Sequence, residues 1–445
     1  MQHWRLMRID DRPRSKRWQW LIVAGGAVVG AVQVVGAVAA AAPASASDLT
    51  CSSTVSISYG AAALTGKITN TAKAACFKFR VVSGDHVRFN VRAVSGSISP
   101  FTDVFDAGGT SKCATPGDIE CTADSTGTWM VQISSSTTGS FHIFAQRLDG
   151  PVGCQPITFG SRPLTGDIAA AADAACFTFS GTAGEVVLGH DQNLASSGAP
   201  FMELLSPDGS QVCFVETGFF TCPLTKTGTQ TVLAYYQAAQ TGKFSMYLQR
   251  MTKPSKCSAL KFAAAPLTKK IASTGAIDCF TYSGPTGALV TVDPVVISGT
   301  LSPETDIFSP AGMSTCATPG ELHDCAIGSA GTWTTLIWDN SGTGTGTFTL
   351  SAVDLDLTPL SGPAGTPVTV SSGGFKSGET VQVKYETGLA SPATVLICHG
   401  KASATGTVSC SGIVPKSKAG AAGRHVVQAV GSTSAHKTSG TFTLT

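Results

Sequence analysis

The sequence has little charge, almost no helical periodicity and, after residue 42, no long apolar run. Charged residues make up only 13% of the chain. Six of the 30 basic and two of the 28 acidic residues precede residue 18, so 24 basic and 26 acidic residues remain beyond it. A protein that wraps a phosphate backbone needs a concentrated positive surface. The charge balance therefore argues against nucleic acid as a partner.

The sequence also lacks the short motifs of the common hydrolases. It contains no H-E-x-x-H and no G-x-S-x-G segment, and its histidines fall at unrelated positions. Glycine-rich pieces such as SGTGTGTF lack the lysine and the strand-to-helix context of a phosphate loop. No nucleophile beside a base and no pair of carboxylates is legible. We therefore predict no enzymatic activity and no required cofactor.

What the sequence does contain is a frame of cysteines that occurs three times. An interval of 37 residues separates the second and third members of each frame, and the first members recur every 103 residues. The three frames and a closing pair account for all 14 cysteines: Cys51, Cys76, Cys113 and Cys121; Cys154, Cys176, Cys213 and Cys222; Cys257, Cys279, Cys316 and Cys325; Cys398 and Cys410. In an exported chain, this usage indicates oxidising conditions and paired thiols.

The spacing of the cysteines favours one pairing scheme. Four cysteines allow three connectivities, and the closeness of the last two in each frame favours a bridge between them. By elimination, the first two cysteines of each frame then pair, and Cys398 pairs with Cys410. The rival interpretation is a zinc site, but the spacings are not of the C-x-x-C kind and paired histidines are absent.

Residues 1–46 have the three parts of a secretory signal peptide. A basic segment precedes an apolar run over 18–42, and a small-x-small site ends at Ala46. The alternative is an uncleaved anchor, because the run is long enough to span a bilayer. Both readings place the remainder outside the cell. We predict a secreted, extracellular protein with no membrane contact after cleavage.

The repeat predicts an all-β chain of tandem antiparallel β-sandwiches. Short alternating apolar segments between Gly, Ser, Thr and Pro clusters fill three copies, at residues 47–151, 152–254 and 255–355. Eight short strands per copy are typical of a jelly-roll sandwich. In the middle copy, the expected strands are 157–159, 164–168, 176–179, 186–189, 201–205, 211–214, 230–235 and 243–249. The pattern changes near Leu355, and residues 356–445 are expected to form a sandwich of another kind.

Aromatic residues at corresponding positions predict a shared core. The expected core residues are Phe105, Leu205 and Phe308, together with Phe141, Phe244 and Phe348. Trp129 and Trp333 share one position, which Gln230 occupies in the middle copy. Since glutamine replaces them without loss of the repeat, they are candidates for a sugar-stacking surface as well as for the core.

Segments of the chain resemble two known kinds of domain. The segments LTGDIAAAADAACFTFSGTAGEVV, FMELLSPDGS, TGTQTVLAYY and TGKFSMYLQR resemble the bacterial pre-peptidase C-terminal domain, a jelly-roll sandwich of exported bacterial proteins. The resemblance covers residues 51–354, three times over, without the peptidase domain that usually accompanies it. The segment SGPAGTPVTVSSGGFKSGE is similar to the Ig-like modules of bacterial surface proteins.

The first resemblance implies calcium as a candidate ligand, because some family members bind it near the sandwich. An acid recurs ten residues before the third cysteine of each frame, at Asp103, Glu203 and Asp306. The family's fuller D-x-D motif is not repeated, and calcium needs six to eight oxygen ligands. The alternative interpretation is a structural acid that accepts hydrogen bonds from a loop.

These observations lead to three hypotheses of function. The first is a secreted, non-catalytic binding, adhesion or spacer protein that presents repeated modules to an extracellular polysaccharide or protein, since linked weak sites raise avidity. The second is an accessory subunit of a secreted peptidase. The third is a cryptic hydrolase, for which His190 with Asp191, in the divergent segment GHDQN, is the nearest candidate.

Overall fold

The computed structural model describes residues 50–445 except 195–199, 216–217, 263–265 and 285–287. The proposed signal peptide lies outside these residues. The described residues belong to one compact unit and form strands and turns, with no helix that could cross a membrane. The prediction of an all-β chain is confirmed.

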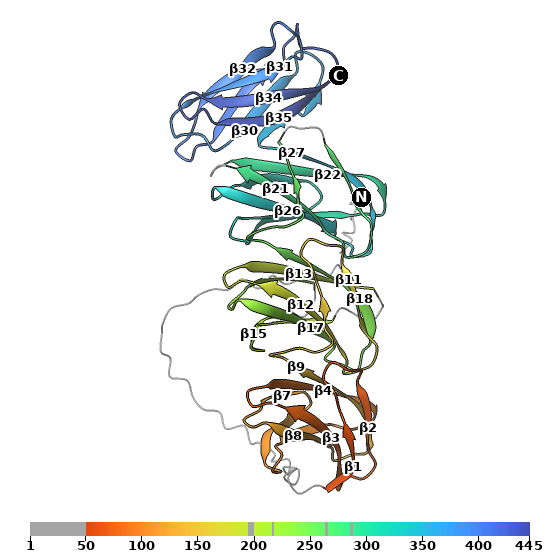
Figure 1. Ribbon diagram of the computed structural model, residues 1–445. Coiled ribbons are helices and arrows are strands. Elements are labelled where there is room, and N and C mark those ends of the chain that lie inside the picture. Colours follow the sequence, from red (N-terminus) through yellow and green to blue (C-terminus); the bar gives the residue numbers. More distant parts are fainter. Residues whose placement is uncertain (1–49, 195–199, 216–217, 263–265, 285–287) are drawn as a thin grey trace, which may run out of the picture. The chain divides into compact units, whose positions relative to one another are not determined.

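Each of the first three copies folds into two facing sheets of five and four strands (Figure 1). The first copy contains β1 (Thr50–Ser56), β2 (Leu64–Ile68), β3 (Lys73–Val81), β4 (His86–Gly96), β5 (Phe101–Phe105), β6 (Ser111–Pro116), β7 (Ile119–Thr122), β8 (Gly127–Ser134) and β9 (Gly139–Arg147). The second contains β10 (Gln155–Pro156), β11 (Leu164–Ile168), β12 (Ala174–Gly181), β13 (Val186–Asn193), β14 (Phe201–Leu205), β15 (Gln211–Val215), β16 (Phe219–Pro223), β17 (Gly228–Tyr235) and β18 (Gly242–Arg250). The third contains β19 (Ser258–Ala259), β20 (Leu267–Ile271), β21 (Asp278–Gly284), β22 (Leu289–Gly299), β23 (Pro303–Phe308), β24 (Ser314–Pro319), β25 (Leu322–Ala326), β26 (Gly331–Asp339) and β27 (Gly346–Val353).

The strand order is the same in all three copies and follows the jelly roll. In the first copy the sheets run β1-β3-β8-β5-β6 and β2-β9-β4-β7. With β1 set aside, consecutive strands alternate between the two sheets except for the hairpin β5-β6, which lies within one sheet, and this is the jelly-roll order. The first strand of each copy, β1, β10 or β19, pairs parallel to the third. It is therefore an exception to the antiparallel pairing that we expected throughout.

The interior of each sandwich contains only part of the expected core. Phe141, Phe244 and Phe348 are completely buried between the sheets. Leu205 and Phe308 are also buried, but they point away from the sandwich interior and pack against the preceding copy. Because alternate residues of a strand face opposite sides, the interior positions of those strands belong instead to Leu204 and Ile307.

Residues 355–445 form a sandwich with a different topology. Its strands are β28 (Leu355–Thr358), β29 (Ser361–Gly362), β30 (Pro367–Ser372), β31 (Thr380–Glu386), β32 (Thr394–Lys401), β33 (Val408–Ile413), β34 (Gly423–Gly431) and β35 (Lys437–Leu444). One sheet runs β28-β30-β33 and the other β29-β35-β34-β31-β32. This fourth module completes the tandem β-sandwiches that we predicted, and its Ig-like character stays a prediction.

Seven disulfides join the cysteines in the pairs that we expected. The first pair of each copy, such as Cys51–Cys76, ties the parallel first strand to the third. The second pair, such as Cys113–Cys121, joins an edge strand of one sheet to an edge strand of the facing sheet. Each such bridge contributes on the order of 2–4 kcal/mol by restricting the unfolded chain.

Candidate ligand-binding grooves

Trp129 and Trp333 do not form a sugar-stacking surface. Their side chains are 0% and 1% exposed and belong to the cores of the first and third sandwiches. Trp333 Nε1 donates to the carbonyl of Ser329, 2.9 Å away, and Gln230 Nε2 donates to the carbonyl of Lys226, 2.7 Å away. Both bonds reach four residues back along the chain. Gln230 therefore reproduces the hydrogen bond of Trp333, whereas the buried Nε1 of Trp129 has no hydrogen-bond partner.

The recurring acid has a hydrogen-bond partner in every copy. Asp103 and Asp306 accept from the hydroxyls of Ser111 and Ser314, at 2.6 and 2.7 Å. In the middle copy the serine is replaced by Gln211, and Glu203 forms an ion pair with Arg88 of the first copy. The structure describes no cluster of three or more acids, histidines or cysteines that could hold a metal ion. These contacts support the structural interpretation of the acid.

In the first and third copies, a threonine precedes this acid and hydrogen-bonds to the turn that follows the adjoining hairpin. The buried hydroxyls of Thr102 and Thr305 donate to the carbonyls of Gly117 and Gly320, at 2.6 and 2.7 Å. A threonine at this place therefore satisfies a turn carbonyl, which an aspartate could not do.

His190 and Asp191 do not form a catalytic pair. They are consecutive residues of β13, so their side chains point to opposite faces of the sheet. His190 stacks on Phe219 at 4.0 Å, and burial lowers its pKa to about 4. Asp191 accepts from the amide of Gly218 at 2.8 Å, and burial raises its pKa to about 7. Both side chains are less than 10% exposed, so this pair does not support a hydrolase.

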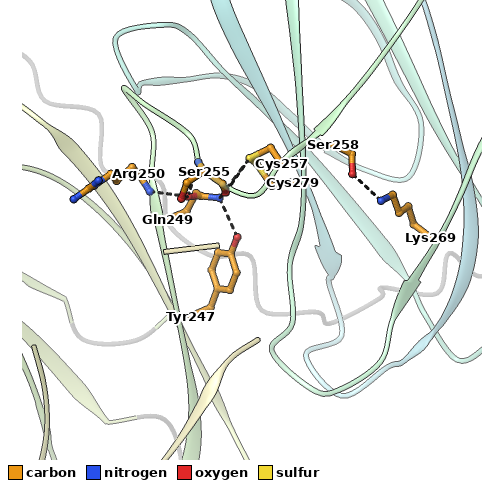
Figure 2. Close-up of a disulfide and its surroundings, with 8 residues drawn as sticks. All are labelled: Tyr247, Gln249, Arg250, Ser255, Cys257, Ser258, Lys269 and Cys279. Atoms are coloured by element: carbon orange, nitrogen blue, oxygen red, sulfur yellow. Dashed lines mark hydrogen bonds between the residues drawn. A yellow bond between two sulfur atoms is a disulfide. The ribbon is translucent and has the colours of Figure 1, made fainter. Parts of the chain in front are cut away.

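A buried glutamine fixes the chain where one copy leads into the next. Gln249, at the end of β18, accepts from the amide of Arg250 at 2.9 Å and donates to the carbonyl of Ser255 at 3.0 Å (Figure 2). Its amide also lies 3.5 Å from Cys257 Sγ, in the first disulfide of the third copy. Gln146 makes the matching contacts with Val152 and Cys154. We call this arrangement the glutamine clamp.

The clamp holds one wall of a groove that occurs in both the first and the second copy. The first groove has a volume of about 560 Å³ and the second about 550 Å³. The residues that line the first groove are Ser56, Ile57, Ser58, Tyr59, Lys78, Phe79, Arg80, Thr128 and Val152. Those that line the second are Pro156, Ile157, Thr158, Phe159, Thr178, Phe179, Ser180, Thr229, Arg250, Ser255 and Lys256. The two sets of lining residues occupy equivalent positions in their copies, from the segment that leads into each sandwich to the third strand.

An aromatic ring at the entrance defines each groove. Tyr59 and Phe159 are half-buried, and each stands edge-on to a core phenylalanine, at ring distances of 6.3 and 5.2 Å. In the second groove, the guanidinium of Arg250 lies 4.4 Å above the ring of Phe159. Hydroxyl groups and exposed basic side chains complete the lining. Such a mixture of ring, hydroxyl and charge can stack on a flat ligand and bond to its polar groups.

A third cavity, of about 490 Å³, lies between β22, β27 and the fourth module. Asp293, Glu321, His323 and Asp356 are among its lining residues. Thr291 Oγ1 donates to Asp356 Oδ1 at 2.8 Å across this space. The cavity has an acidic lining unlike that of the two grooves.

The sequence did not lead us to predict the two grooves or the glutamine clamp. A signal was present, because the dipeptide Gln-Arg follows the last-strand phenylalanine at the same distance in FHIFAQR and FSMYLQR. The third copy has Val353 and Asp354 there instead, and the fourth module that follows has no cysteine at the matching place. The dipeptide Gln-Arg therefore occurs in the two copies whose glutamine contacts the first cysteine of the following copy.

Comparison with known proteins gives no family for this chain. No family model matches, and no curated protein matches. Among solved structures, a tetra-tandem repeat in the extending region of a large adhesion protein is 11% identical, with a TM-score of 0.17, and the match covers 84% of this chain and 99% of that one. An E. coli alpha-2-macroglobulin is 10% identical, with a TM-score of 0.15 over 81% of this chain and 28% of that one. At these scores, the function has to be inferred from the chain's own residues.

Proposed function

We propose that this chain is an exported, non-catalytic binding protein that presents its β-sandwich modules in series to an extracellular polysaccharide or protein surface. One observation carries the proposal: two copies have a groove of matching size, place and lining. Two weak sites on one chain bind a polymeric surface far more tightly than either does alone. Repetition without a catalytic constellation fits binding better than turnover.

The covalent structure supports an extracellular location. Seven disulfides staple the four modules, and such bridges persist in oxidising compartments. Membership of the first three copies in the pre-peptidase C-terminal family, and of the fourth in the Ig-like modules, is part of the same proposal. The jelly-roll strand order supports the former.

Pull-down of residues 47–445 on insoluble polysaccharides, cell walls and collagen tests the proposal. Ser58→Met and Thr158→Met place a longer uncharged side chain in the first and second groove. Each should weaken retention, and the double variant should weaken it most, because two linked sites are lost together. Thr65→Met and Thr165→Met are matched controls, since both threonines are exposed on strands away from the grooves.

Two results would contradict the proposal in different ways. Retention that is equal for the groove variants and the controls would show that the grooves are not the binding sites. Failure of the unaltered chain to bind any of the three materials would leave only a spacer role.

A further inference from the structure

The two grooves share a charge as well as a shape. Lys78 and Arg80 line the first groove, and Arg250 and Lys256 line the second. No carboxylate is among the lining residues in the described part of the chain. The chain beyond residue 17 has two more acids than bases, so a purely basic lining is not a consequence of overall composition.

The positive charge reaches the two grooves from different strands. In the first copy it comes from β3, where Lys78 and Arg80 are exposed. The corresponding residues of β12, Thr178 and Ser180, are uncharged. There the charge comes instead from Arg250, at the end of β18, and from Lys256 in the linker. Basic residues at non-equivalent positions therefore give both grooves a positive charge.

The basic side chains are placed to meet a ligand. Within the described residues, Lys78, Arg80 and Lys256 lie beyond ion-pair distance of any carboxylate, and Lys256 Nζ bonds the hydroxyl of Ser161 at 2.5 Å. Arg250 donates to the carbonyl of Ser180 at 2.8 Å, its Nε lies 3.5 Å from a carboxylate oxygen of Glu185, and its guanidinium lies over the ring of Phe159. A cation beside an aromatic ring favours a ligand that carries an anionic group on a ring.

We infer that both grooves bind an acidic polysaccharide, a chain of sugar rings that bears carboxylate or sulfate groups. The inference rests on the proposed binding function and names its ligand class. In the first groove a sugar ring stacks on Tyr59, and in the second it lies beside Arg250, which covers the ring of Phe159. In both grooves the ammonium and guanidinium groups donate charge-assisted hydrogen bonds to the anions. A polymer with repeated anions engages both grooves, which a single charged sugar does not.

Titration of residues 47–445 with four polymers tests this ligand class. Polygalacturonate carries carboxylates and dextran sulfate carries sulfates, while fully methyl-esterified pectin and dextran are their neutral counterparts. We expect binding to the acidic members only, weakened by salt. Lys78→Gln with Arg80→Gln should weaken binding about tenfold, and so should Lys256→Gln alone.

A triple variant that combines Lys78→Gln, Arg80→Gln and Lys256→Gln is compared with a control of equal charge. Lys67→Gln, Lys401→Gln and Lys437→Gln remove three exposed charges outside the grooves and should leave the affinity within about twofold of the original. Binding of only polygalacturonate, only dextran sulfate or both would support the inference and identify the anion. Equal binding of the neutral polymers, or equal loss in the triple variant and the control, would overturn it while the proposed function stands. Binding to none of the polymers, cell walls or collagen would overturn both.

Discussion

A buried ion pair joins the first and second copies, and its removal gives the sharpest test of the structure. Arg88 on β4 contacts Glu203 on β14, and the two side chains are 8% and 4% exposed. Arg88 also donates to Asn90 at 2.9 Å, and its guanidinium lies 4.2 Å above the ring of Tyr235. A buried charge that is left without its partner costs far more than the pair contributes.

The second junction supplies the matched substitution. Leu188 stands at the position of Arg88 and packs in an apolar cluster with Leu336 and Phe308 of the third copy. Arg88→Leu alone therefore leaves Glu203 buried without its charge partner and should destabilise the first junction by about 3–5 kcal/mol. Arg88→Leu with Glu203→Leu removes both charges and should recover most of this loss, because apolar replacements of a buried pair are often neutral. A residual cost of about 1–3 kcal/mol is expected in both variants, because the buried Oδ1 of Asn90 loses its donor.

Native-state trypsin digestion measures the opening of this junction. Arg147 precedes the linker between the two copies, and Arg250 holds the same place before the next linker, so each digest contains its own control. When opening is fast relative to cleavage, the rate follows the open population, and about 3 kcal/mol corresponds to a rise of roughly 150-fold. Arg88→Leu should accelerate cleavage after Arg147 and leave cleavage after Arg250 unchanged. Equal rates after Arg147 in the original and the single variant, or an equally fast double variant, would refute this account of the junction.

Three further predictions concern the buried polar and aromatic groups. Burial raises the pKa of Asp306 to about 7, so the folded chain keeps a proton that the unfolded chain loses. The contribution of Asp306 to the free energy of unfolding should therefore fall as the pH rises from about 4 to about 7. Urea titrations over this range should show a weaker decrease for Asp306→Asn than for the original chain. Trp333→Ala should cost about 3–5 kcal/mol in the same assay and leave polysaccharide affinity of the folded protein unchanged, because the ring is in the core. Gln249→Leu leaves the amide of Arg250 and the carbonyl of Ser255 without their partner, at a cost of about 1–3 kcal/mol, and should speed hydrogen exchange at the Arg250 amide. Unchanged exchange at this amide would show that the glutamine clamp does not stabilise the junction.

The covalent frame and the architecture were predictable because both depend on short-range patterns. Close cysteines such as Cys113 and Cys121 join neighbouring edge strands, so their spacing alone indicated the bridge. Alternating apolar residues located most strands of the middle copy. The expected strand over 157–159 is wrong: the pairing with β12 ends at Pro156, and the following residues line the groove.

The features that the sequence did not predict depend on contacts between residues far apart in the chain. The strand β16 was missed because FFTC does not alternate, and its Phe220 fits only opposite Gly189, where an added Cβ would lie 2.1 Å from the ring. His190 looked chemically suggestive because it differs from the other copies. In the structure it stacks on Phe219, whose ring centroid lies 4.6 Å from that of Trp338 in the third copy, so His190 belongs to an aromatic cluster at the second junction.

The copies differ where they meet, so a repeat period alone could not assign roles to the single residues of these junctions. Arg88, Leu188 and Thr291 hold one position on the same strand of three equal sandwiches, yet each suits a different neighbour. Arg88 pairs with an acid of the second copy, Leu188 enters an apolar cluster with the third, and Thr291 bonds Asp356 of the fourth module. A lone arginine against the apolar second junction would be a buried charge without a partner. At this position, the side chains that differ between copies therefore match each sandwich to its own successor.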